Sequence, residues 1–79
     1  MPQRIAVYDG PGSPDTAELF YRGRMQTLGW AEDDTFRELA ARQGKHALKF
    51  GNAKGREVAL DLASGDDGQG LTVVAIQTH

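Results

Sequence analysis

Alternating hydrophobic and polar positions dominate the second half of the chain and predict a β-hairpin. Apolar side chains recur at every second position in residues 46–50 and again in residues 57–62. The two segments are separated by residues 51–55, which contain two glycines and an asparagine. A period of two on both sides of a glycine-rich segment is typical of paired strands joined by a turn.

The same alternation predicts how the two strands of the hairpin pair. In the expected register Phe50 lies opposite Arg56, and Leu48 lies opposite Val58. A slip of one residue would set Phe50 against Glu57, which brings an apolar ring beside a carboxylate. We therefore expect Lys49 to lie opposite Glu57 instead, on the other face.

Two further apolar segments predict strands near the ends of the chain. Residues 5–8 are β-branched and aromatic and stop at the turn formed by residues 9–12. Residues 71–76 carry apolar groups at both odd and even positions, which is typical of a strand inside a sheet. We expect this last strand to lie between the first strand and the hairpin.

Residues 13–28 show the signals of an α-helix. Ser13 or Asp15 can cap its N-terminus, Pro14 suits the first turn, and Gly29 follows where a left-handed residue often ends a helix. The side chains expected on the buried face of this helix are Ala17, Phe20, Tyr21, Met25 and Leu28. These cap signals favour a helix over an alternating strand in this segment, and they place Trp30 against Met25.

A second, shorter helix is expected from Thr35 to Gly44. Thr35 and Glu38 have the spacing of a capping box, in which each side chain satisfies a free backbone N–H. The acidic residues 32–34 just before it are favourable near the positive end of a helix dipole, and they form a compact negative group. Phe36, Leu39 and Ala40 form its apolar side.

Together these elements predict an α+β fold with a four-stranded, mostly antiparallel sheet, two helices packed on one face, and the order β-α-α-β-β-β. The 79 residues are expected to form a single small domain, residues 1–79, because so short a chain cannot bury two cores. There is no cysteine, and no stretch approaches the apolar length of a membrane helix. We therefore expect a cytoplasmic protein that does not bind membranes.

Charge is unevenly distributed along this chain of net charge −2. Residues 39–56 contain no Asp or Glu, but they contain a group that we call the basic residues: Arg42, Lys45, Lys49, Lys54 and Arg56. Such a segment either solvates an edge hairpin or meets phosphates or carboxylates of a partner. The leading hypothesis is a small non-enzymatic binding or regulatory protein. It would dock on a protein partner, or on a second copy of itself, through this basic hairpin and a sheet edge.

The alternative hypothesis is nucleic-acid binding, with His46 as a catalytic residue in its enzymatic version. Residues 42–50 resemble the segment around the catalytic histidine of HicA-type toxin endoribonucleases, where a Gly and a His open a short hairpin. That resemblance implies that His46 acts as general acid or base in RNA cleavage. The chain departs from the pattern because no Ser precedes the histidine and because it begins and ends on predicted strands. A partly buried structural histidine is the simpler interpretation.

The remaining polar groups predict no cofactor, metal or small-molecule site. The turn at residues 9–14 precedes a helix, but Pro11 and Pro14 remove N–H donors, and Asp9 would repel a phosphate. Asp66 and Asp67 lack the spacing of a calcium loop. We interpret them as solvated turn residues.

Overall fold

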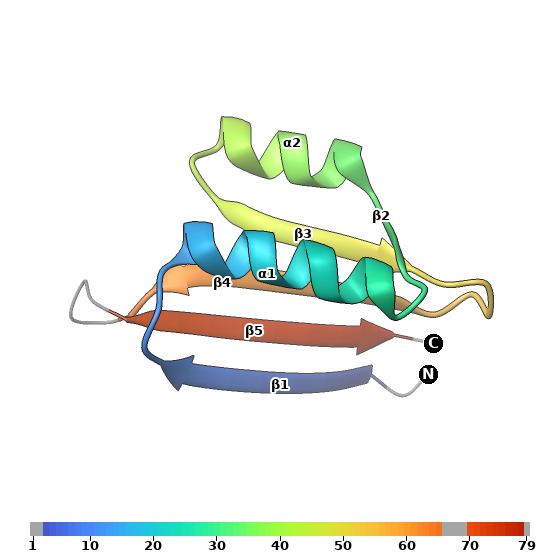
Figure 1. Cartoon of the computed structure of the whole chain (residues 1–79), viewed down its shortest axis with the longest axis horizontal. Helices are drawn as coiled ribbons and strands as arrows, with labels where there is room; N and C mark the ends of the chain where they lie inside the picture. The colour runs from blue at the N-terminus through green and yellow to red at the C-terminus, as the bar shows by residue number, and fades with distance from the viewer. Residues whose placement is uncertain (1–2, 66–69, 79) are drawn as a thin grey trace.

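The computed structural model describes residues 3–65 and 70–78, which form two helices and an antiparallel sheet (Figure 1). The sheet has five strands in the order β1-β5-β4-β3-β2. The elements in chain order are β1 (Gln3–Gly10), α1 (Pro14–Thr27), β2 (Ala31–Glu32), α2 (Asp34–Arg42), β3 (His46–Gly51), β4 (Glu57–Ser64) and β5 (Leu71–Thr78).

The α+β class is confirmed, and so is the interior position of the last strand, because β5 pairs with both β1 and β4. The expected number of four strands is wrong. The additional strand, β2, pairs its two residues with Phe50 and Gly51 of β3. Two residues are too few to produce an alternating pattern, so the sequence carries no periodic signal for this strand.

The hairpin of β3 and β4 is confirmed, but the expected register is wrong by two residues. Phe50 lies opposite Val58, and Leu48 lies opposite Leu60. The cause is the turn, in which the Asn52 side-chain oxygen accepts hydrogen bonds from the backbone N–H groups of Lys54 (3.0 Å) and Arg56 (3.1 Å). Arg56 is thereby held in the turn. Because the shift is an even number of residues, every side chain keeps its expected face.

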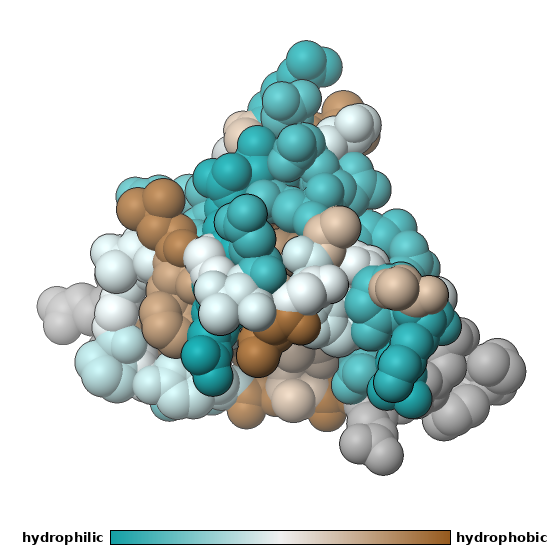
Figure 2. Space-filling view, turned by 45° about the vertical axis from the view of Figure 1, so that its right-hand side comes forward, coloured by the Kyte–Doolittle hydropathy of each residue, from teal (hydrophilic) through white to brown (hydrophobic). Residues whose placement is uncertain are grey.

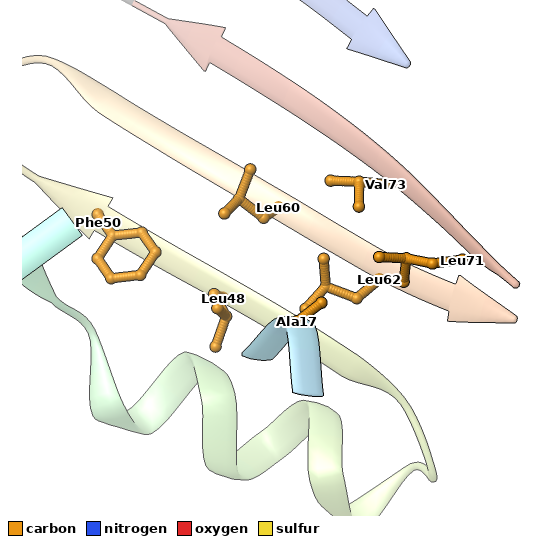
Figure 3. Packing of buried hydrophobic residues seen from close by; sticks show 7 residues of the cluster. All are labelled: Ala17, Leu48, Phe50, Leu60, Leu62, Leu71 and Val73. Atoms are coloured by element: carbon orange, nitrogen blue, oxygen red, sulfur yellow. The ribbon is translucent and has the colours of Figure 1, made fainter. Parts of the chain in front are cut away.

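The hydrophobic core lies between α1 and one face of the sheet (Figure 3). Alternation along β3, β4 and β5 brings six buried apolar side chains to this face, and α1 contributes one small buried side chain that allows the helix to approach closely. The buried residues are Ala17, Leu48, Phe50, Leu60, Leu62, Leu71 and Val73.

Both ends of α1 follow the sequence signals. The Ser13 hydroxyl accepts a hydrogen bond from the backbone N–H of Thr16 (3.3 Å), which confirms Ser13 as the N-cap. Beyond the C-terminus Gly29 adopts a φ of 90°, and the Trp30 N–H donates to the Met25 carbonyl (2.9 Å). The glycine is needed there because a side chain disfavours this left-handed conformation.

The buried face of α1 is narrower than the sequence predicts. Tyr21, Met25 and Trp30 pack against the core as expected. Phe20 and Leu28, which were expected beside them, are 61% and 57% exposed. The core strands present a strip that one side of the helix covers, so apolar residues at the margins of that side remain in solvent.

The N-cap of the second helix lies two residues earlier than the capping-box pattern predicts. This N-cap is Asp33, whose carboxylate accepts a hydrogen bond from the Phe36 N–H (3.1 Å), so the expected Thr35 cap is wrong. The Asp33 N–H donates to the Lys49 carbonyl (2.8 Å). This bond continues the pairing with β3 as far as residue 33, and the helix starts directly after it.

The expectation that both helices pack on one face of the sheet is wrong. α2 runs along the edge at β3, whereas α1 lies over β3 and β4 (Figure 1). The Lys49 ammonium lies 5.9 Å from the centre of the Phe36 ring. Lys49 alternates with the buried residues Leu48 and Phe50, so its side chain is on the opposite face from α1. α2 therefore adjoins that opposite face.

Candidate functional site

The face of the sheet opposite α1 carries a central group of apolar side chains. The strand registers place on this face, which we call the open face, the apolar residues Ile5, Val7, Ala47, Ala59, Val74 and Ile76. In β1 the side chains of Ile5 and Val7 are 63% and 62% exposed. Apolar side chains gathered on one surface are typical of an interaction site, whereas single exposed ones are not informative.

A groove separates the open face from α2. It has a volume of about 410 Å³, and both walls are largely apolar. From α2 it is lined by Phe36, Leu39 and Ala40, and Leu39 is 52% exposed. The sheet side of the groove includes Val74 and Ile76. α2 thus forms an apolar ridge along one margin of the open face, and β1 forms the other margin.

A few charged groups lie within or beside the open face. Asp61 and Lys45 both line the groove, so the groove contains one carboxylate and one ammonium group. The Lys49 ammonium lies 3.6 Å from the Glu57 carboxylate. At the β1 margin, the Asp9 carboxylate accepts a hydrogen bond from the Thr72 hydroxyl (2.7 Å) and remains exposed.

The structure does not bring the five basic residues together. Arg42 and Lys45 are exposed before the start of β3, and Lys54 and Arg56 are exposed in the turn after its end. Six residues of strand separate these two groups by roughly 20 Å. Lys49 lies between them and is paired with Glu57. The sequence groups these cations because it does not reveal that β3 extends between them.

Hydrophilic side chains cover α2 on the side visible in Figure 2, at the top of the view. Apolar side chains on that surface form separate patches. The apolar residues Phe36, Leu39 and Ala40 of α2 line the groove, so this nine-residue helix is amphipathic.

His46 lies on the same face as the core, as its alternation with Leu48 predicts. Its two ring nitrogens face carboxylates of α1: Nε2 is 3.4 Å from Asp15 Oδ1, and Nδ1 is 3.6 Å from Glu18 Oε1. The sequence analysis missed these partners because they come from a helix and not from a neighbouring strand position. Two carboxylates beside the imidazole would repel the phosphate of an RNA substrate. The arrangement instead joins the start of α1 to β3.

The acidic residues 32–34 are engaged within the protein and do not form a free negative group. Glu32 of β2 accepts hydrogen bonds from Arg22 Nε (2.9 Å) and Arg37 Nη1 (2.6 Å), and Asp34 also pairs with Arg37 (3.2 Å). The hydrogen bond to Glu32 raises the pKa of the Arg37 guanidinium above its ordinary value. Glu32 therefore connects α1, β2 and α2.

Other candidate sites have little support in the described residues. The Ser13 hydroxyl in the turn before α1 caps the helix and also donates to Thr16 Oγ1 (3.0 Å). Asp66 and Asp67 lie outside the described residues. Within residues 3–65 and 70–78, no three His, Asp or Glu side chains are close enough together to hold a metal ion. Over the same residues, no helix is long and apolar enough to cross a membrane.

No protein-family model matches this chain, and comparisons with curated proteins and with solved structures also give no match.

Proposed function

We propose that this protein is a non-enzymatic docking domain that binds a protein surface through the open face and the groove beside α2. The observation that carries the proposal is the exposure of Ile5, Val7 and Leu39 at the two margins of the open face, with the apolar groove along the α2 margin. Burying such side chains contributes about 25 cal/mol per Å² of apolar surface removed from water, before the cost of association is subtracted. The sequence-based hypothesis of a protein partner is retained, and the contact surface is moved from the basic hairpin to the open face.

The basic residues contribute to this proposal in a smaller way. Arg42 is the exposed last residue of α2, and the exposed Lys45, three residues later, lines the groove. Charges at the rim of an interface favour one orientation of the partner and speed association more than they add affinity. We therefore expect the partner to carry carboxylates opposite these two residues.

Nucleic-acid binding remains an alternative, with weaker support. Phosphate contacts need several cations along one track, and here the exposed cations are in two groups at opposite ends of β3. Binding of a random RNA or DNA duplex at low salt can be measured for the wild type. It can also be measured for a variant with Lys45, Lys49, Lys54 and Arg56 changed to Glu. Salt-sensitive binding that the variant loses would favour nucleic acid over protein docking.

The docking function is tested by photo-cross-linking in living cells. A benzophenone amino acid replaces Leu39, which lies on α2 beside the open face. In a matched control it replaces Leu19, which is 69% exposed on α1. We expect a discrete protein adduct from position 39 and none from position 19. Equal labelling from both positions, or no adduct from position 39, would refute docking through the open face.

A further inference from the structure

We propose that the partner of the open face is a second copy of this chain, in a two-fold dimer in which α2 of each copy lies over β1 and β5 of the other. This inference rests on the proposed docking function, because it uses the same surface. It is carried by the shape, size and charge of the open face.

The open face is complementary to itself. An apolar ridge, α2 with Leu39, stands along the β3 margin, whereas the uncovered side chains Ile5 and Val7 lie along the β1 margin. A two-fold axis parallel to the strands and lying between two facing sheets exchanges these margins. α2 of each copy then covers β1 of the other copy. The two-fold axis repeats this contact, so both exposed margins of each chain become buried.

The size of the face matches that of a stable interface. The three spacings from β1 to β3 cover about 14 Å, α2 adds roughly 10 Å, and strands of eight residues extend about 26 Å. The flat area of the open face together with α2 is therefore roughly 600 Å², without the additional surface of protruding side chains. This area is close to the ~800 Å² that each partner buries in a standard interface.

Charges at one end of the face support this orientation. The connection from α2 to β3, with Arg42 and Lys45, lies at the same end of the sheet as Asp9, because β1 and β3 run in opposite directions. Rotation about an axis parallel to the strands keeps these ends together. It places Arg42 and Lys45 of one copy near Asp9 of the other, so the exposed cations meet an exposed carboxylate.

Asp61 opposes dimer formation. Its side chain is exposed on β4, near the middle of the face, where the two-fold axis would pass. Enclosing this carboxylate costs free energy, which Lys45 in the same groove offsets in part. The variant Asp61→Asn is therefore expected to tighten the dimer, whereas a dimer formed through another surface would not respond to it.

Cysteine cross-linking tests the arrangement directly, since the natural chain has no cysteine. A tagged Leu39→Cys variant is mixed with an untagged Val7→Cys variant and oxidised mildly. Both positions are exposed, so folding should be retained, and circular dichroism checks this. We expect a disulfide-linked species that contains one chain of each kind. The same two positions within a single chain lie at opposite edges of the sheet, beyond the ~7 Å that a disulfide can bridge.

A charge exchange provides the matched specificity test. In sedimentation experiments Asp9→Lys or Arg42→Glu alone should weaken the dimer several-fold, and the two changes combined should restore much of the lost affinity. Leu19→Glu, on the α1 side, should leave the dimer unchanged. Val7→Glu should abolish it.

A monomer at all concentrations, or Val7→Cys chains that link to one another through paired β1 edges, would overturn the proposed dimer. Cross-linking from position 39 in cells separates this failure from failure of the docking function. An adduct with a different protein would support the docking function and would exclude a second copy as the partner of the open face. An adduct of two copies of the chain supports the dimer, and loss of all adducts at position 39 refutes both proposals.

Discussion

Glu32 is the residue on which the connection between the two helices depends. Its carboxylate is 15% exposed and accepts hydrogen bonds from Arg22 and Arg37. Partly buried hydrogen bonds to charged groups contribute about 1.5–3 kcal/mol each, less where solvent screens them. Glu32→Gln keeps the shape and removes the charge, so we expect the free energy of unfolding to fall by about 1–2 kcal/mol in urea titrations.

The matched control for Glu32 is Glu57→Gln. The Glu57 carboxylate is 56% exposed and lies 3.6 Å from the Lys49 ammonium. An exposed pair of this kind contributes about 0–1 kcal/mol. Losses of equal size in the two variants would show that the Glu32 contacts do not connect the helices as described.

The charge of the Arg37 guanidinium responds little to the pH of the solvent. Its pKa is raised in the folded state, so the folded protein holds this proton more tightly than the unfolded chain does. The stabilisation is fully present below the ordinary pKa of arginine and is lost only as the pH rises through the raised value. The guanidinium thus remains charged throughout the range in which the protein would normally be studied.

The start of α2 provides a second test at single residues. Asp33→Ala removes the side chain that accepts from the Phe36 N–H, and loss of such a cap costs about 1 kcal/mol. Thr35→Ala changes the residue that the sequence pattern favours as the cap. We expect Asp33→Ala to lower the urea midpoint and Thr35→Ala to leave it within error. The opposite order would place the N-terminus of the helix at Thr35.

At the scale of the elements, the turn between β3 and β4 decides how the hairpin pairs. Gly55 in this turn has a φ of 78°, and a Cβ added there would meet no atom within 4 Å. Gly55→Ala therefore tests backbone conformation without a steric clash, and we expect a loss of about 1 kcal/mol. Thermal unfolding followed by circular dichroism measures it.

Gly23 is the matched control for Gly55. It lies inside α1, and a Cβ added there also meets no atom within 4 Å. Because alanine is the better helix former, Gly23→Ala should stabilise the protein by roughly 0.5–1 kcal/mol. Destabilisation by both substitutions would mean that a local clash, and not backbone conformation, controls these sites.

The elements differ in how far the sequence could predict them. The strands β3 to β5 and the helix α1 were predictable because alternation and cap residues act locally. The register was not, because it depends on two hydrogen bonds that Asn52 accepts within the turn. The side on which α2 lies was also not predictable. A nine-residue amphipathic helix specifies that one side is apolar, but not which sheet face it meets.

The candidate site was predictable in part. Apolar residues at both odd and even positions of β5 already indicated a strand that meets apolar surroundings on two faces. The sequence interpretation used this pattern only to place β5 inside the sheet and put both helices on one face, so the apolar residues of the other face were not recognised as a surface. The spread of the five basic residues along β3 was not predictable from their spacing in the sequence, since proximity along an extended strand is not proximity in space.

At the scale of the whole molecule, the uneven covering of the sheet links stability to association. Among the residues that the structure describes, seven side chains form the buried core, and a core of this size leaves a small margin of stability in a chain without disulfides. Covering the open face with a second copy adds buried apolar surface on the side that α1 does not reach. A dimer of this kind couples folding to protein concentration, because association draws chains out of the unfolded state.

This coupling predicts that the thermal midpoint rises with concentration. A tenfold increase stabilises a two-state dimer by about 1.4 kcal/mol, or about 0.7 kcal/mol per chain, which corresponds to roughly 3–5 °C for a chain of this length. Scanning calorimetry over two decades of concentration measures the shift. We expect Leu19→Glu to retain it and Val7→Glu to abolish it while keeping a cooperative transition, because Val7 is 62% exposed outside the core. A wild-type midpoint independent of concentration would mean that the chain folds alone, leaving the open face free for a different protein.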